Sequence, residues 1–160
     1  MSDDSVPAAS GKLTSITIPQ SVTKIEGAAF WSAAITSLSI PSSVVNVEDY
    51  VCRSCSNLKT VRYEGSVIGK YMFVGCTALN SFTIANTVKT IGDHCFNYCS
   101  SLETITYEGS LENWAAVTKG SNWDGKSGQE NVVSGLTRIQ CLDGYLRFDD
   151  TAKEWKEVRE

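Results

Sequence analysis

Four of the six cysteines stand in a pattern that could do chemistry. Cys52 and Cys55 form a C-x-x-C motif, and Cys95 and Cys99 follow further along the chain. A C-x-x-C pair in a thioredoxin-like fold is a redox centre, and four thiolates together have the donor set of a zinc site. One hypothesis is therefore a cysteine-based metal or redox protein, and the rest of the sequence tests it.

Two further features invite a catalytic interpretation. His94 is the only histidine, so a histidine-dependent triad would have to use it, but no serine nucleophile motif accompanies it. A glycine-rich stretch at 119–135 contains two lysines but lacks the ordered glycine, lysine and serine spacing that holds a phosphate. We interpret the stretch as a loop, and we predict no catalytic residue, no metal site and no cofactor.

The elements that must hold these residues repeat along the chain. Five six-residue segments share the order apolar, polar, polar, apolar, polar, apolar, and their starts lie 22, 23, 21 and 23 residues apart. Their β-branched and aromatic residues favour strands. A fixed period of this length indicates units that stack and share one core. The segments are residues 13–18, 35–40, 58–63, 79–84 and 102–107.

Each unit also contains a turn with a characteristic spacing. Pro19 and Pro41 end the first two strands, because proline cannot donate a hydrogen bond to a neighbouring strand. Further on, an aromatic residue or cysteine is followed three positions later by a small apolar residue, which suits one tight helical turn. These pairs are Phe30 with Ala33, Cys52 with Cys55, Phe73 with Cys76, and Phe96 with Cys99.

The repeat gives the cysteines a structural role. Cys55, Cys76 and Cys99 each stand three residues before the next strand's leucine, and no thioredoxin-like βαβ pattern surrounds the C-x-x-C motif. We expect small, buried and mostly free thiols in a core column, since cysteine is among the most buried residue types. A disulfide remains an alternative, because neighbouring strands lie about 4.8 Å apart. His94 shares a column with two tyrosines and is expected to be a partly buried structural residue.

Several phrases of the sequence carry a resemblance to a known repeat type. They are Leu-Thr-Ser-Ile-Thr-Ile-Pro at 13–19, Ile-Gly-Asp at 91–93, Phe-x-x-Cys-Ser-Ser-Leu at 96–102 and Trp-Ala-Ala-Val-Thr-Lys-Gly-Ser-Asn-Trp at 114–123. Together they resemble the BspA-like leucine-rich repeat family. The resemblance covers about residues 13–144 and implies a curved β-solenoid. It also implies adhesion or protein binding by surface or secreted proteins of bacteria and some protists, and it carries no catalytic residues.

The predicted fold is mainly β with short helical turns: a leucine-rich repeat solenoid of about five repeats with an atypical C-terminal cap and a terminal β-hairpin. The boundaries are 1–12 for an N-terminal tail, 13–110 for the repeats, 111–144 for the cap and 145–160 for the hairpin. The cap begins with a short amphipathic helix at 111–117. For the last element a helix capped by Asp150 is the alternative. This tail either folds back on the cap or docks on a partner.

Composition narrows the class of partner. The chain has 160 residues, a net charge of -4 and 42% apolar residues, which is ordinary for one globular domain. The acidic balance gives no general attraction to phosphate backbones, so we expect no nucleic acid, and no apolar stretch is long enough for membrane insertion. The first eleven residues lack the basic and apolar regions of a secretory signal, which leaves an intracellular chain or an excised fragment as interpretations.

The outward strand positions are the candidate binding surface for a protein ligand. Strand alternation places them on one face, with Lys59 and Arg62 adjacent at its centre. The alternative is that threonine here simply favours strands and solvent. The two predicted columns are Thr14, Thr36, Lys59, Asn80 and Glu103, and beside them Thr17, Ser39, Arg62, Thr83 and Thr106.

The tail aromatics Tyr145, Phe148 and Trp155 are candidates for apolar contact, because a lone hairpin is marginal in water. Such a contact would make a homo-oligomer or another assembly. The rival function is therefore a structural or attachment component of an assembly such as a phage particle, with the virion as its location. The primary prediction is a non-enzymatic binding or adhesion module at the cell surface or outside the cell.

Overall fold

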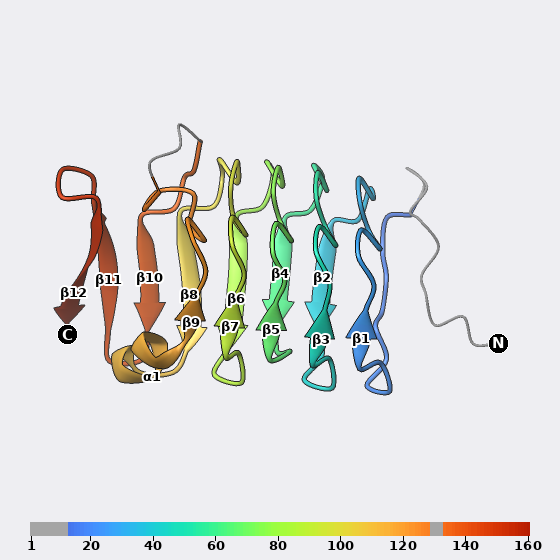
Figure 1. The fold of residues 1–160 in the computed structure, drawn as a ribbon, viewed down its shortest axis with the longest axis horizontal. Helices are drawn as coiled ribbons and strands as arrows, with labels where there is room; N and C mark the ends of the chain where they lie inside the picture. The colour runs from blue at the N-terminus through green and yellow to red at the C-terminus, as the bar shows by residue number, and fades with distance from the viewer. Residues whose placement is uncertain (1–12, 129–132) are drawn as a thin grey trace.

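The structure is a computed structural model that describes residues 13–128 and 133–160. Its strands form three sheets around one apolar core, and equivalent strands of successive repeats stack along the long axis (Figure 1). The predicted mainly β repeat solenoid is confirmed.

The main sheet contains seven strands in the order β12-β11-β10-β8-β6-β4-β2. The strands from β2 to β10 pair in parallel, because each comes from the same place in its repeat, whereas β11 and β12 add to the end in antiparallel fashion. The bounds are β2 Ser37–Ile40, β4 Thr60–Tyr63, β6 Ser81–Ala85, β8 Thr104–Glu108, β10 Arg138–Cys141, β11 Gly144–Asp149 and β12 Glu154–Arg159.

Short strands form the other wall of the core and lie in front of the main sheet in Figure 1. They make two small parallel sheets, β1-β3 and β5-β7-β9. Each two-residue strand from β1 to β7 ends in a buried apolar residue that points between the walls. The bounds are β1 Lys24–Ile25, β3 Asn46–Val47, β5 Val67–Ile68, β7 Thr90–Ile91 and β9 Thr118–Lys119.

Alternation along the strands builds the core. In β4, Thr60 and Arg62 are exposed while Val61 and Tyr63 are buried, and β2 has the same order. Because the register is kept from repeat to repeat, equivalent inward side chains of successive strands stack on one another. A one-residue shift would turn the whole apolar set toward solvent.

The first expected strand, at 13–18, is not a regular strand. The backbone N–H of Thr36 donates to the carbonyl oxygen of Thr14 at 3.2 Å, so the segment keeps its place beside β2. Within the described residues, the segment 13–18 has a neighbouring strand on one side only. It can therefore form only half of the backbone hydrogen bonds of a central strand.

The turns keep the predicted spacing but are not helical. The N–H of Cys55 donates to the carbonyl of Cys52 at 3.2 Å, and that of Cys76 donates to Phe73 at 3.1 Å, which are the bonds of a tight turn. However, Tyr50 and Ser54 have φ of 64° and 59°, in the left-handed region. Such a backbone cannot continue a right-handed helix.

The cap extends both walls of the repeat. Its helix α1 spans Leu111–Ala116, as predicted, and the Ser110 hydroxyl caps it by accepting from Asn113 N. After it, β9 pairs with β7 and β10 pairs with β8, so both walls extend through the predicted cap. Among the described residues, no helix has the length and apolar character needed to cross a membrane.

The tail is a hairpin, and the helix alternative is wrong. The two strands pair in antiparallel register from Gly144 opposite Arg159 to Asp149 opposite Glu154. The carboxylate of Asp149 accepts from the backbone N–H groups of Thr151 and Ala152, so a side chain holds the turn where a helix would begin.

Candidate functional site

The second predicted surface column lies in one row across the main sheet. Arg62 is the register partner of Ser39 on one side and of Thr83 on the other. Thr106 follows Thr83, and Gln140 of β10 follows Thr106. The structure therefore brings the strand residues of this column together and extends the row by one strand.

The first predicted column is held together by backbone hydrogen bonds. The N–H of Lys59 donates to the carbonyl of Thr36 at 2.9 Å, and the N–H of Asn80 donates to that of Lys59 at 3.0 Å. Its residues precede the regular strands and project to solvent. The exposed members of this column, with Thr17 of the other column, are Thr14, Thr17, Thr36, Lys59, Asn80 and Glu103.

A third outward column lies between the two predicted ones. Sequence reasoning missed it, although the signal was there: stepping back two residues from Arg62 reaches Thr60, on the same side of the strand. Its members are Ser37, Thr60, Ser81, Thr104 and Arg138. We call the three columns together the strand face.

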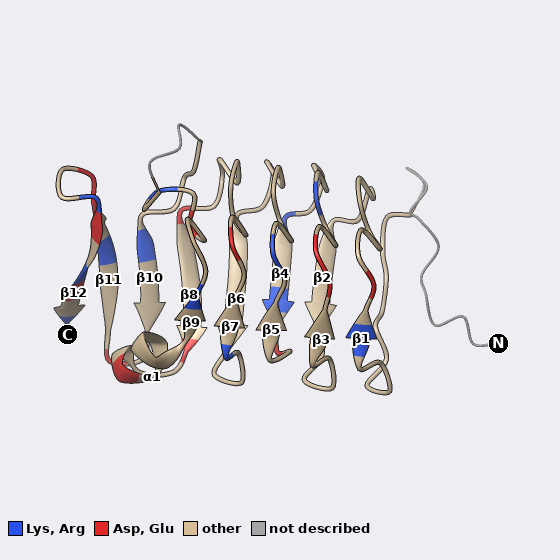
Figure 2. Ribbon diagram, viewed as in Figure 1, with Lys and Arg blue, Asp and Glu red and all other residues tan. Residues whose placement is uncertain are grey.

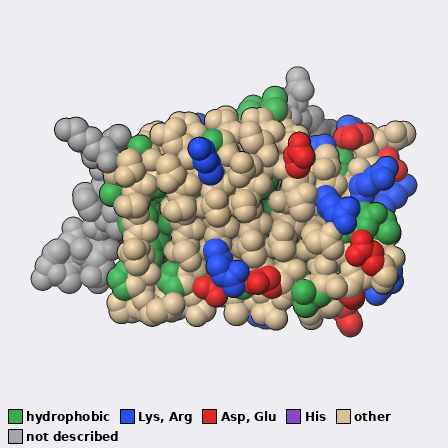
Figure 3. All heavy atoms as spheres, turned by 180° about the vertical axis from the view of Figure 1, so that it is seen from behind, with side chains coloured by type: hydrophobic (Ala, Val, Ile, Leu, Met, Phe, Trp, Pro, Cys, Tyr) green, Lys and Arg blue, Asp and Glu red, His purple; other side chains and the backbone are tan. Residues whose placement is uncertain are grey.

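The strand face is rich in serine and threonine hydroxyl groups. Figure 3 shows few charged side chains over most of this side of the molecule. Arg62 is not a free cation, because its Nη2 lies 2.8 Å from Glu108 Oε1 and 3.5 Å from Glu64 Oε2. The hydrogen bond to Glu108 raises the pKa of Arg62. Within the described parts of the chain, Lys59 has no such partner, so the expected basic centre reduces to Lys59.

The cysteines fill core positions, as the repeat predicts. All six are buried and free. The Sγ of Cys55 donates to the carbonyl of Phe30 at 3.0 Å, and that of Cys99 donates to Phe73 at 3.1 Å. Cys76 makes the same bond to the carbonyl of Cys52 in the preceding repeat. Each of these three thiols thus links two repeats while it fills a small space.

Burial makes the thiols of Cys52, Cys95 and Cys99 poor nucleophiles. It raises the pKa of Cys99 to about 12 and raises the pKa of Cys52 and Cys95 well above the usual value. These three residues are therefore thiols, not thiolates, at neutral pH. Cys55 differs, because its hydrogen bonds with Cys52 and Cys76 lower its pKa to about 4. In residues 13–128 and 133–160, no group of three or more histidine, cysteine, aspartate or glutamate side chains is arranged to hold a metal ion.

His94 ends a stack of aromatic rings along the turns. Its ring lies 5.0 Å from that of Tyr71, which lies 4.8 Å from that of Tyr50, and Trp31 follows at 5.9 Å. Asn97 Nδ2 lies 3.0 Å from His94 Nδ1. The residues from Tyr50 to His94 in this stack have φ between 53° and 64°. A left-handed residue costs about 1–2 kcal/mol, and ring stacking offsets part of that.

The lysines of the glycine-rich stretch are used internally. Lys119 Nζ donates to the carbonyls of Trp114 and Val117 at 2.8 and 2.9 Å, and burial lowers its pKa to about 8. The buried carboxylate of Asp124 accepts from the backbone N–H groups of Lys126 and Ser127. These bonds shape a loop, as predicted. The part of the stretch at 129–132 lies outside the described residues.

The tail aromatics divide between the two sides of the hairpin. Phe148 is buried, and the indole N–H of Trp155 donates to Asp124 Oδ2 at 2.7 Å. The Trp155 ring also lies 6.1 Å from that of Trp123. Tyr145 is on the outward side, under the guanidinium of Arg138 at 3.6 Å. The tail therefore folds back on the cap, and two of its three predicted contact residues are engaged there.

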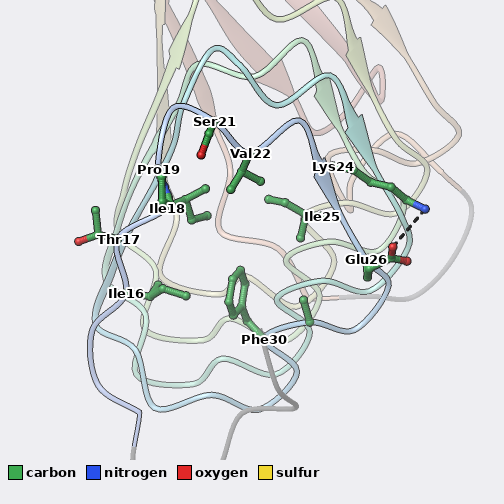
Figure 4. A pocket seen from close by; sticks show the side chains of 11 residues that line it. Ile16, Thr17, Ile18, Pro19, Ser21, Val22, Lys24, Ile25, Glu26 and Phe30 are labelled. Carbon is green, nitrogen blue, oxygen red and sulfur yellow. Dashed lines mark ion pairs between the residues drawn. The ribbon is translucent and has the colours of Figure 1, made fainter. Parts of the chain in front are cut away.

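An apolar cavity marks the other end of the core (Figure 4). It has a volume of about 240 Å³. The side chains of Ile16, Ile18 and Phe30 line it, and the ion pair of Lys24 with Glu26 at 3.3 Å lies on its rim. The cavity is the inner face of the first described repeat, so its apolar lining is the end of the shared core.

The match to a family model supports the repeat assignment. The model of the BspA type leucine-rich repeat region matches six copies over residues 8–117. A leucine-rich repeat protein of known structure from Bacteroides ovatus is similar at 18% identity and a TM-score of 0.43 over 80% of this chain, which spans 39% of that protein. No curated protein matches. Because the family model covers more than half of the residues, this chain belongs to the BspA-type leucine-rich repeat family.

Proposed function

We propose that this chain is a non-enzymatic protein-binding module that engages its partner through the strand face. The observation that carries the proposal is the register of outward polar side chains on parallel strands. Beside Arg62, the hydroxyl groups of this row are those of Ser39, Thr83 and Thr106. The inward side chains of the same strands fill the core. The outward side chains therefore contribute less to the stability of the fold.

The chemistry of this surface suits a polypeptide. Each hydroxyl can donate and accept a hydrogen bond, so an array of them can pair with the amide groups of a partner. The strands hold the array rigidly, which reduces the entropy lost on binding. The columns contain no aromatic side chain on which a sugar ring could stack. A protein ligand is therefore the better match than a glycan.

An adhesive role and a location at the cell surface or outside the cell belong to the same proposal. Their support is the family to which the repeats belong. The rival role in attachment to an assembly such as a phage particle rested on exposed tail aromatics. It has less support, because Phe148 and Trp155 pack on the chain's own cap.

Variants of the strand face test the proposal. The full chain serves as bait in extracts of the cells that produce it and of the cells they contact. We expect Thr83→Arg to abolish capture of a protein that the unchanged chain retains, because a long cation at the centre of the face blocks close approach. The matched control is Val45→Arg, at an exposed position in the turn between β2 and β3.

Two results would count against the strand face. One is equal capture by the unchanged chain and Thr83→Arg. The other is equal loss of capture in both variants, which would place the contact elsewhere or reflect charge alone. Melting temperatures of both variants show whether each remains folded.

A further inference from the structure

A row of three cations crosses the outward side of the C-terminal hairpin. Arg138 on β10 is directly opposite Arg147 on β11, and Arg147 is directly opposite Lys156 on β12. Directly opposed residues of an antiparallel pair project to the same side of the sheet. Figure 2 shows the basic positions on the neighbouring strands β10 and β11.

The row is unfavourable for folding unless something neutralises it, because like charges directly opposite one another destabilise a sheet. The chain neutralises the two outer cations. Arg138 lies 3.7 Å from Glu160, and Lys156 lies 2.8 Å from Asp149. The middle cation, Arg147, is exposed, and no carboxylate of the described residues lies within ion-pair distance of it. One excess positive charge therefore remains at the centre of the row.

The row lies in a hollow of about 740 Å³ that is open to solvent. Its lining includes Thr137, Arg138, Arg147, Asp149 and Lys156. A volume of this size is within the range of pockets that hold a small ligand or a few residues of a peptide. The hollow is thus a concave surface with a free guanidinium inside it.

Neighbouring contacts fix the geometry around this guanidinium. Arg138 is held by its hydrogen bonds to Gln140 Oε1 at 2.6 and 2.9 Å and by the ring of Tyr145 beneath it. Arg147 has no comparable contact with residues 13–128 or 133–160, and it can turn its planar fork toward a ligand. A guanidinium of this kind pairs with a carboxylate through two parallel hydrogen bonds.

We propose that this hollow binds an acidic peptide segment of a protein partner, with one carboxylate paired to Arg147. A polyanion with continuous charge fits less well, because Asp149 and Asp150 also line the hollow. A peptide can place one or two carboxylates beside the cations and neutral residues beside these aspartates. The hollow is distinct from the centre of the strand face, so the proposal stands even if Thr83 contacts no partner.

Fluorescence polarisation with two labelled peptides tests this. The acidic probe is Ser-Glu-Ser-Ser-Glu-Ser, and the neutral probe has glutamine in place of both glutamates. We expect the full chain to bind the acidic probe saturably and the neutral probe not at all. Arg147→Gln should weaken binding of the acidic probe about tenfold, as expected for loss of a charge-assisted pair, without lowering the melting temperature.

Two control variants separate this site from net charge and from the centre of the strand face. Lys89→Gln removes one exposed cation outside the hollow, and Thr83→Arg changes the strand face. We expect Lys89→Gln to keep the affinity for the acidic probe and Thr83→Arg not to weaken it. The proposal is overturned if the unchanged chain fails to bind, if both probes bind equally, or if Arg147→Gln and Lys89→Gln have the same effect.

Discussion

The guanidinium of Arg62 on β4 lies 2.8 Å from the carboxylate of Glu108 at the end of β8, across the intervening strand β6. This ion pair links two repeats that are not adjacent. It also neutralises the cation that sequence alone placed at the centre of the binding surface. The strand face is consequently closer to a neutral hydroxyl surface than to a basic one, which changes the kind of partner it fits.

Replacing Arg62 with glutamine should cost little stability. The side chains of Arg62 and Glu108 are 44% and 43% exposed. Ion pairs between exposed side chains contribute about 0.2–1 kcal/mol to stability. Urea denaturation of Arg62→Gln, Glu108→Gln and the double variant measures the coupling. A coupling above about 2 kcal/mol would show that the pair holds the repeats together far more strongly than its exposure implies.

The register of β6 predicts opposite outcomes for neighbouring residues. Ile84 is fully buried, so Ile84→Asp places an unpaired charge in the core and should cost more than about 4 kcal/mol or prevent folding. Thr83 projects outward, and Thr83→Ala should change stability by less than about 1 kcal/mol. Thermal melts that gave equal losses would show that the strand is assigned to the wrong face.

The buried thiols predict a loss of stability at alkaline pH. The unfolded chain loses the proton of Cys99 near its ordinary pKa of 9.0, whereas the folded chain keeps it until about 12. The unfolded state therefore binds fewer protons between these values, and the free energy of unfolding falls as pH rises from 9 toward 12.

Cys99→Ala isolates this effect. The variant should lose about 1–2 kcal/mol at pH 7, since it gives up packing and the bond to the carbonyl of Phe73, and its stability should fall less steeply above pH 9. Urea denaturation across this pH range provides the comparison. An unchanged slope would mean that Cys99 is accessible to solvent in the folded chain.

The contact between tail and cap predicts a specific cost for Trp155→Phe. The substitution leaves one oxygen of the buried Asp124 carboxylate without its indole donor, and hydrogen bonds to charged groups contribute about 1.5–3 kcal/mol. Tyr98→Phe is the matched control, because it removes a polar group from an exposed ring and should stay within about 0.5 kcal/mol. If the two variants had the same melting temperature, the tail would not be docked on the cap in solution.

The period of the repeat predicted which residues of successive repeats lie next to one another. The strand register, the buried cysteines and the position of His94 beside Tyr71 all follow from one rule, that equivalent residues of successive repeats stack. The helix at the start of the cap was predicted from its own local pattern. The same rule also contained the column of Thr60, which a stricter count of alternation would have found.

Contacts between different kinds of element could not be predicted from the sequence. Trp155 meets Asp124 across 31 residues, and Arg62 meets Glu108 across 46, and neither pair follows the repeat. The structure at the ends of the repeat array was harder to predict for a different reason. At 13–18 the local pattern is that of a strand, yet regular strand pairing needs neighbours that lie outside the segment itself.

Site-specific photo-crosslinking tests the central claim most directly. A photoreactive phenylalanine is placed at Thr83 on the strand face in one chain and at Val45 in the turn between β2 and β3 in another, and both are irradiated in the cells that produce the chain. The strand-face account predicts a discrete crosslinked protein from position 83 and none from position 45. The same product from both positions, or a product from position 45 alone, would contradict it.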